Sequence, residues 1–142
     1  MILRVDVIDN ALKSLGVSKN TENQKIILTD ARGTTYKQSK ALEYSKLKRL
    51  TIICGHYEGI DHRVHDNLVD DIVSIGNYVL TGGEIPAMII TDSVTRLIPG
   101  VIKENSLKEE SFSLNDEEAT EYPQYTRSPV YNNMKVPEIL LL

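Results

Sequence analysis

Short apolar runs that alternate with longer helix-like segments restrict the fold of this 142-residue chain more than any other feature. The three runs are too short for helices, are rich in β-branched residues and lack the alternation of a half-exposed strand. They lie at residues 25–28, 50–54 and 72–75. Apolar residues three or four positions apart predict helices over residues 5–15, 37–47, 61–68 and 85–98. Strands that alternate with helices predict an α/β domain with a parallel sheet flanked by helices.

Local residue types refine this prediction. Gly16 is expected to end the first helix, because glycine adopts the left-handed conformation that closes a helix. The helix over residues 37–47 is expected to turn Ala41, Leu42 and Ser45 inward. The first strand is expected to end in a loop at residues 29–33, which read Thr-Asp-Ala-Arg-Gly.

The length of the chain fits one domain over residues 1–142. Residues 101–131 are acidic, poor in apolar residues and without periodicity, which predicts a long loop or an interdomain linker. Residues 136–142 are strand-like. The opening helix has no preceding strand to cover its apolar face, so the chain is expected to lack a beginning and an end.

The charge is distributed unevenly along the chain. Residues 1–50 carry ten Lys and Arg against five Asp and Glu, and residues 51–142 carry six against fifteen. A polyanion is therefore expected to meet the first part of the chain rather than the second. No apolar run approaches a membrane span and no signal peptide opens the chain, so a cytoplasmic protein is expected. The single cysteine excludes an internal disulfide and a multi-cysteine metal site.

Glycines cluster after the predicted strands. Five of the eight glycines lie between Gly55 and Gly83. Ligands of open α/β sheets bind at the carboxyl ends of the strands, where glycine lets the backbone approach them closely. Each glycine alone is better explained as a turn residue, but three clusters after successive strands favour a ligand site. No G-x-G-x-x-G or P-loop pattern is present, so a dinucleotide or nucleoside triphosphate has no support.

The last helix begins in a pattern that has two interpretations. Thr81 and Glu84 match a capping box, and Pro86 suits a first helical turn. This is either only a helix start, or the free N–H groups of Gly82 and Gly83 face a ligand.

Other reactive side chains form no standard pattern. His56, Glu58 and the segment at residues 61–66 suggest a metal, but their spacing matches no known ligand set, and a solvated polar loop is the alternative. Cys54 closes a strand and is expected to be a core residue. Arg96 is expected to be paired or to extend its charge to the surface unless it points into a site.

Two segments, however, are specific. ICGHYEGID at residues 53–61 and SIGNYVLTGGEIPAM at residues 74–88 closely resemble the bacterial tRNA (guanine-N1)-methyltransferase family TrmD, of the SPOUT superfamily. The match continues at residues 92–101, 110–112, 123–127 and 136–139. The resemblance implies a SPOUT-type fold with a deep C-terminal trefoil knot, an obligate homodimer with shared active sites, and methyl transfer from S-adenosylmethionine to N1 of the guanosine 3′ of the tRNA anticodon. It also allows Mg²⁺ as a cofactor.

The resemblance further implies roles for individual residues. Glu110 stands where the family has the aspartate that removes the N1 proton, Arg96 would stabilise charge on the guanine oxygen, and Glu58 would orient the base or the cofactor. Should Glu110 not serve, Glu109 and Glu121 are the next candidates. The residues expected to hold the cofactor are Leu28, Gly55, Tyr57, Ile75, Gly76, Asn77, Tyr78, Val79, Leu80, Gly82, Gly83 and Pro86.

The chain also departs from the family. Asn77 replaces a usual acidic residue, and the opening strands and the C-terminal tRNA-binding domain are expected to be missing. Two alternatives therefore stay open: a truncated, inactive dimer that still binds S-adenosylmethionine, and a metal-dependent hydrolase that uses the histidine loop.

Overall fold

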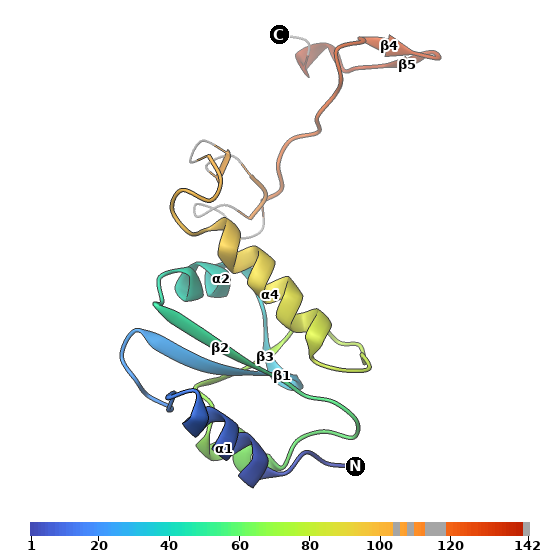
Figure 1. Cartoon of the computed structure of the whole chain (residues 1–142). Helices are drawn as coiled ribbons and strands as arrows, with labels where there is room; N and C mark the ends of the chain where they lie inside the picture. The colour runs from blue at the N-terminus through green and yellow to red at the C-terminus, as the bar shows by residue number, and fades with distance from the viewer. Residues whose placement is uncertain (104–105, 108–109, 113–118, 141–142) are drawn as a thin grey trace.

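A three-stranded parallel sheet forms the centre of the protein in the computed structural model, which describes residues 1–103, 106–107, 110–112 and 119–140 (Figure 1). The strand order is β2-β1-β3, with β1 at Gln24–Thr35, β2 at Arg49–Cys54 and β3 at Asp71–Ser74. Both outer strands run parallel to β1, with Leu28 opposite Ile53 on one side and Ile72 on the other. The predicted α/β fold with a parallel sheet is confirmed.

Helices cover both faces of the sheet, α2 and α4 on one side and α1 and α3 on the other (Figure 1). The four helices span Val5–Ser14 (α1), Gln38–Ser45 (α2), His62–Asn67 (α3) and Glu84–Arg96 (α4). Successive side chains of β1 point to opposite faces. Ile26 and Leu28 pack with α1 and α3, while Ile27 packs with α2 and α4. All three are fully buried, which explains the absence of polar–apolar alternation in this strand.

The inner face of α2 differs in part from the prediction. Ala41 is buried as expected, but Leu42 and Ser45 are only half-buried, and Tyr44 takes the second inward position. The reason is a polar contact across the core, since the Tyr44 hydroxyl donates to Asp71 Oδ2 at 2.9 Å. Gly16 follows the end of α1 with φ of 63°, as predicted for the residue that closes a helix.

Strand β1 runs further than predicted, and the expected loop at residues 29–33 is an irregularity inside it. Thr29 and Thr34 both pair with Val73, so residues 30–33 bulge out between them. Gly33 makes the return to the sheet feasible, because a Cβ there would lie 2.5 Å from the Val73 nitrogen. A motif of turn-forming residues therefore does not end this strand.

The start of α4 also differs from the prediction. Its N-cap is Gly83, without a side-chain cap, so the capping box of Thr81 and Glu84 does not form. The cause is the Gly83 N–H, which donates to the Gly55 carbonyl at 2.7 Å and ties the helix start to the end of β2. Of the two interpretations, the one in which the N–H of Gly83 is free to face a ligand is therefore wrong.

The chain leaves the sheet after α4 and ends in a small hairpin away from it (Figure 1). Strands β4 (Val130–Tyr131) and β5 (Met134–Lys135) form this hairpin, and the 3₁₀ turn η1 spans Glu138–Leu140. The predicted strand over residues 136–142 is wrong at Glu138–Leu140, which form a turn in which the Leu140 N–H donates to the Pro137 carbonyl at 3.0 Å. Residues 141–142 lie outside the described part. Within the described residues, no helix has the length and apolar character to cross a membrane.

Candidate functional site

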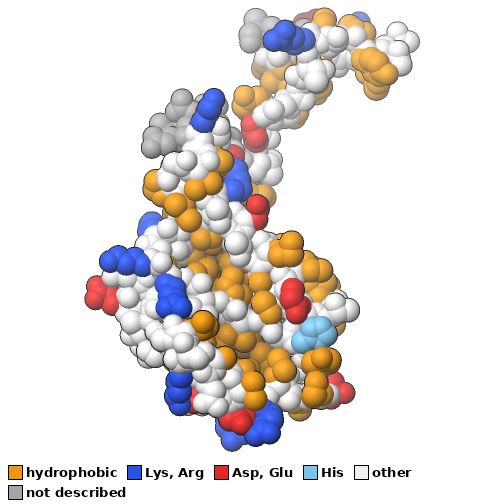
Figure 2. Space-filling model, viewed as in Figure 1, with side chains coloured by type: hydrophobic (Ala, Val, Ile, Leu, Met, Phe, Trp, Pro, Cys, Tyr) orange, Lys and Arg blue, Asp and Glu red, His pale blue; other side chains and the backbone are white. Residues whose placement is uncertain are grey.

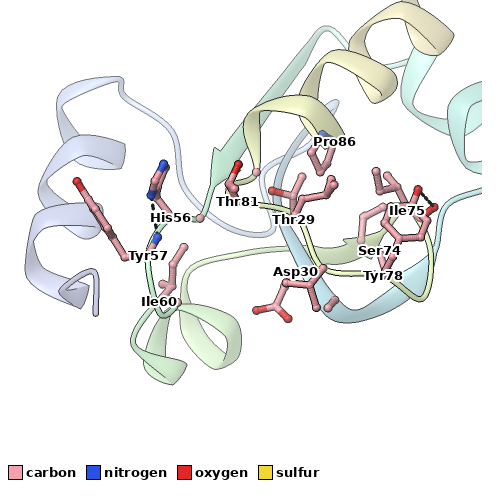
Figure 3. A pocket seen from close by; sticks show the side chains of 18 of the residues that line it. Thr29, Asp30, His56, Tyr57, Ile60, Ser74, Ile75, Tyr78, Thr81 and Pro86 are labelled. Atoms are coloured by element: carbon pink, nitrogen blue, oxygen red, sulfur yellow. Dashed lines mark hydrogen bonds between the residues drawn. The ribbon is translucent and has the colours of Figure 1, made fainter. Parts of the chain in front are cut away.

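A cavity of about 210 Å³ opens where the carboxyl ends of the three strands meet the start of α4 (Figure 3). Its wall consists of residues 29–31, where the bulge of β1 begins, and of the loops after β2 and β3. Ligand sites of parallel sheets are expected at such a place. Its volume is below the roughly 300–1,000 Å³ of most small-molecule sites. The residues that line it are Thr29, Asp30, Ala31, Gly55, His56, Tyr57, Glu58, Gly59, Ile60, Val73, Ser74, Ile75, Gly76, Tyr78, Val79, Leu80, Thr81, Gly82, Gly83 and Pro86.

Close backbone packing holds the base of this cavity. Gly83 lies so near its neighbours that a Cβ would come within 2.3 Å of Thr29 Oγ1 and 2.8 Å of both Cys54 Cα and the Gly55 nitrogen. Gly82 differs, because its added Cβ would meet the flexible end of the Glu84 side chain. Of these two glycines, only Gly83 has neighbouring backbone atoms that require the absence of a side chain.

The loop after β2 carries backbone strain. Tyr57 has φ of 59°, a left-handed conformation that is rare for an aromatic residue. Its N–H donates to His56 Nδ1 at 2.8 Å, which compensates part of the energetic cost of this conformation (Figure 3). The other ring nitrogen, His56 Nε2, takes no part in this hydrogen bond. Strain of this kind tends to occur at functional sites.

The loop after β3 folds back on itself. The Tyr78 hydroxyl donates to the Ile75 carbonyl at 3.1 Å, and the Tyr78 ring packs against Gly76, whose φ is 151° (Figure 3). A Cβ at Gly76 would lie 2.4 Å from that ring. This loop therefore needs glycine both for its conformation and for its packing.

The charged groups of the cavity are all acidic. Its described lining residues include the carboxylates of Asp30 and Glu58 and no Lys or Arg. Burial raises the pKa of Asp30, but hydrogen bonds from Arg32 and His65 outweigh it and lower that pKa to about 2. Asp30 is therefore ionised at neutral pH. A cavity with this charge suits a neutral or cationic ligand better than a nucleoside phosphate.

Most of the predicted cofactor residues come together here. Ten of the twelve line the cavity, namely Gly55, Tyr57, Ile75, Gly76, Tyr78, Val79, Leu80, Gly82, Gly83 and Pro86. Leu28 does not, because it is fully buried in the core beneath the site, and Asn77 is exposed outside the lining. The sequence analysis missed Asp30 and its neighbours, although they directly follow the first apolar run.

The three predicted catalytic residues are divided between two places. Glu58 lines the cavity and forms an exposed ion pair of 3.5 Å with the amino group of Met1. Arg96 and Glu110 pair with each other at the far end of α4, with Arg96 Nη2 2.6 Å from Glu110 Oε2. The ten residue steps of helix from Pro86 to Arg96 span about 15 Å. Within one chain, this ion pair therefore lies away from the cavity. Of the alternative bases, Glu109 lies outside the described residues.

The remaining predicted groups do not assemble into a metal site. In the part of the chain that the structure describes, no group of three or more His, Cys, Asp or Glu side chains could hold a metal ion. His62 stacks on His65 in α3, with ring centroids 4.8 Å apart. Cys54 is half-buried, and burial followed by the charge of Glu84 raises the pKa of its thiol, which makes it a poor nucleophile.

The whole chain is similar to one family of enzymes. A sequence model of the family tRNA (guanine-1)-methyltransferase TrmD matches residues 1–142. The chain is 50% identical over 141 residues to the tRNA (guanine-N(1)-)-methyltransferase of Mycoplasma mobile, which covers 99% of the chain and 67% of that relative. It is 45% identical to the enzyme of the same name from Clostridioides difficile, over 99% of the chain and 60% of the relative. It is 44% identical to the enzyme of that name from Staphylococcus aureus, over 99% of the chain and 56% of the relative. The chain thus spans little more than half of most of these relatives' length.

Proposed function

The chain belongs to the tRNA (guanine-1)-methyltransferase TrmD family, and from this premise we propose that it transfers a methyl group from S-adenosylmethionine to N1 of a tRNA guanosine. The guanosine expected from the resemblance is the one 3′ of the anticodon. The observation that carries the proposal is the cavity at the strand ends, which is built from the two segments most similar to the family.

The charge of the cavity suits S-adenosylmethionine. The methyl donor is a sulfonium cation, and the wall offers the carboxylates of Asp30 and Glu58 without a competing Lys or Arg among its described residues. As the resemblance implies, the backbone of Gly55 and of residues 75–80 would meet the adenosyl group. The methionine end would be framed by Tyr57, Glu58, Gly82, Gly83 and Pro86. When bound, S-adenosylmethionine supplies the methyl group and leaves as the neutral thioether S-adenosylhomocysteine.

The chain's own contribution to the chemistry is the ion pair of Glu110 and Arg96. Guanine N1 carries a proton at neutral pH, so its electron pair becomes available only when a base takes that proton. In this proposal the Glu110 carboxylate accepts the proton, and the hydrogen bond from Arg96 Nη2 at 2.6 Å holds this carboxylate in place. As the proton leaves N1, negative charge grows on the guanine oxygen, and the Arg96 guanidinium can stabilise it.

We further propose that the active site is completed by a second copy of the chain. The cavity and the Arg96–Glu110 pair lie at opposite ends of α4, so one chain does not bring the methyl donor and the base together. Helix α4 also exposes Ile85, Met88 and Ile89, and Figure 2 shows hydrophobic side chains gathered along this face. A homodimer would cover these side chains and could bring the cavity of one chain to the ion pair of its partner.

Other expectations from the resemblance remain part of this proposal. They are a SPOUT-type trefoil knot, a cytoplasmic location, tRNA as the partner, and residues 1–142 as the methyltransferase core with residues 101–131 as its acidic loop or linker. The described residues do not fit a divalent cation, because they contain no group of three potential ligands. We therefore derive no step through Mg²⁺.

Two measurements test the proposal. Titration calorimetry with S-adenosylhomocysteine should show binding, and absence of heat at millimolar ligand would contradict it. Transfer of a labelled methyl group should then occur to a tRNA that carries the guanosine, and not to one with adenosine at that position. Binding without transfer would favour the alternative of an inactive dimer that binds S-adenosylmethionine.

A further inference from the structure

A four-residue bulge of β1 separates two cavities. Residues 30–33 leave the sheet between Thr29 and Thr34. Asp30 and Ala31 line the cavity described above, while Arg32 and Gly33 line a second cavity of about 330 Å³. The bulge is thus a thin wall with open space behind it.

A side chain from α3 anchors this wall. The imidazole of His65 has only 2% of its side chain exposed and lines the second cavity. Its Nε2 lies 2.9 Å from Asp30 Oδ2, and Arg32 Nη2 lies 3.5 Å from the same nitrogen. Asp30 in turn accepts from the Arg32 backbone N–H at 2.9 Å, which closes the bulge on itself. The Asp30 carboxylate therefore connects His65 to the backbone of Arg32, so that one side chain of α3 is linked to both of these residues of the bulge.

The other nitrogen of this imidazole indicates that the contact with Asp30 is specific. His65 Nδ1 is buried and has no hydrogen-bond partner among the described residues. Buried polar atoms usually have a partner, so a residue with one unpaired nitrogen is a poor choice for filling the core. The Nε2–H bond to an ionised acceptor is the contact that offsets this cost.

We infer that His65 is a positioning residue, which acts through Asp30 to hold residues 30–33 as the wall of the cofactor cavity. The identity of the ligand rests on the proposed function, but the positioning of the wall does not. Neither residue belongs to the glycine-rich segments on which the cofactor site was predicted. The contact between His65 and Asp30 therefore gives α3 a role in ligand affinity that the sequence pattern does not indicate.

The test compares five variants of the chain in two measurements. These are the dissociation constant for S-adenosylhomocysteine, by calorimetry, and hydrogen exchange of the backbone amides of residues 31–33 without ligand. His65→Leu should weaken binding about tenfold, as expected for the loss of one charge-assisted hydrogen bond, and should speed the exchange. His65→Gln, which keeps a neutral donor, should restore binding to within about threefold. Asp30→Ala should weaken binding at least as much as His65→Leu, because it also removes a carboxylate of the cavity wall, and the double variant should be no worse than Asp30→Ala.

Val64→Ala is the matched control, because Val64 is fully buried in the same helix and does not contact the bulge through a polar atom. It should lower stability without changing the dissociation constant. Equal loss of affinity in Val64→Ala and His65→Leu, equal weakness of the Gln and Leu variants, or additive effects in the double variant would each overturn the inference. If the parent does not bind S-adenosylhomocysteine, the proposed function fails, and unchanged exchange in His65→Leu would then overturn the positioning role separately.

Discussion

Arg96 holds Glu110 through two hydrogen bonds, with Nη2 2.6 Å from Oε2 and Nη1 3.4 Å from Oε1. The contact joins the last turn of α4 to a residue fourteen positions later, and it raises the pKa of Arg96. Glu110 keeps only 17% of its side chain exposed. The carboxylate proposed as the base is therefore held in place before any tRNA arrives. A guanine must then share or replace one of these two bonds.

The first prediction concerns this carboxylate. Glu110→Gln should lower methyl transfer at least about a hundredfold, since an amide cannot accept the N1 proton, and should leave the dissociation constant for S-adenosylhomocysteine unchanged. Glu110→Asp should retain or improve transfer, because it restores the aspartate that the family has at this position. Single-turnover methylation of tRNA and calorimetry would measure the two effects.

Glu121→Gln serves as the comparison, because Glu121 is an exposed carboxylate of the same acidic segment and the alternative candidate for the base. It should leave the transfer rate within about twofold of the parent, as for most surface substitutions. Equal transfer by Glu110→Gln and the parent would show that the base lies elsewhere.

The second prediction compares neighbouring glycines. In Gly83→Ala the new Cβ would meet backbone atoms of Cys54 and Gly55 at 2.8 Å, so the start of α4 must move and lose its bond to the Gly55 carbonyl. In Gly82→Ala the closest contact is the end of the Glu84 side chain, which can rotate away. Urea unfolding should show a loss of about 1–3 kcal/mol for Gly83→Ala and less than about 1 kcal/mol for Gly82→Ala. The reverse order would mean that the packing at Gly83 is not the constraint.

Much of the fold could be predicted because the sheet is buried on both faces. Continuous apolar runs such as residues 26–28, which are fully buried, are typical of a strand that is covered on both faces. The extension of β1 could not be predicted, because residues 29–33 are turn formers by type, and only the neighbouring strand shows that Gly33 returns to the sheet. The capping box failed for a similar reason. A distant contact with the Gly55 carbonyl decides where α4 begins, and local sequence does not contain it.

The candidate site shows the same division. The glycine clusters located the strand-end loops correctly, since a rule about parallel sheets connects sequence to location. Asp30 was missed because its neighbours resemble an ordinary turn, and its partner His65 lies 35 residues later. Arg96 is separated from the cavity because α4 is long, and no sequence motif indicates this separation.

The third prediction tests the exposed face of α4. Met88 has 70% of its surface exposed in one chain, which is unusual for a large apolar residue beside two others. If a second copy covers it, Met88→Arg should shift a dimer toward monomer and abolish methyl transfer, because a buried charge without a partner opposes association. Light scattering after gel filtration would measure the mass, and circular dichroism should show an unchanged fold. A parent that is monomeric at high concentration would contradict the proposed dimer.

The last prediction concerns an acidic group within the core. Asp71 accepts hydrogen bonds from Lys25 Nζ and from the Tyr44 hydroxyl, both at 2.9 Å. Burial raises the pKa of Asp71, but these two donors outweigh it and lower that pKa below 3.8. A carboxyl whose pKa is lower in the folded state stabilises the fold above its unfolded pKa and loses this contribution as pH falls through the folded value. The stabilisation from Asp71 should therefore be complete at neutral pH and should disappear below pH 3.8.

Tyr44→Phe should isolate this effect. Removing the hydroxyl lets the folded pKa of Asp71 rise toward its ordinary value, so urea unfolding at pH 7 should show a loss of about 1 kcal/mol. The loss should shrink as the pH is lowered below 3.8, because a protonated Asp71 no longer favours the donor. Tyr36→Phe is the matched control, since that hydroxyl lies 2.7 Å from the uncharged Ser93 Oγ and its loss should cost the same at every pH. Parallel pH profiles for the two variants would show that the Tyr44 hydroxyl does not act through the charge of Asp71.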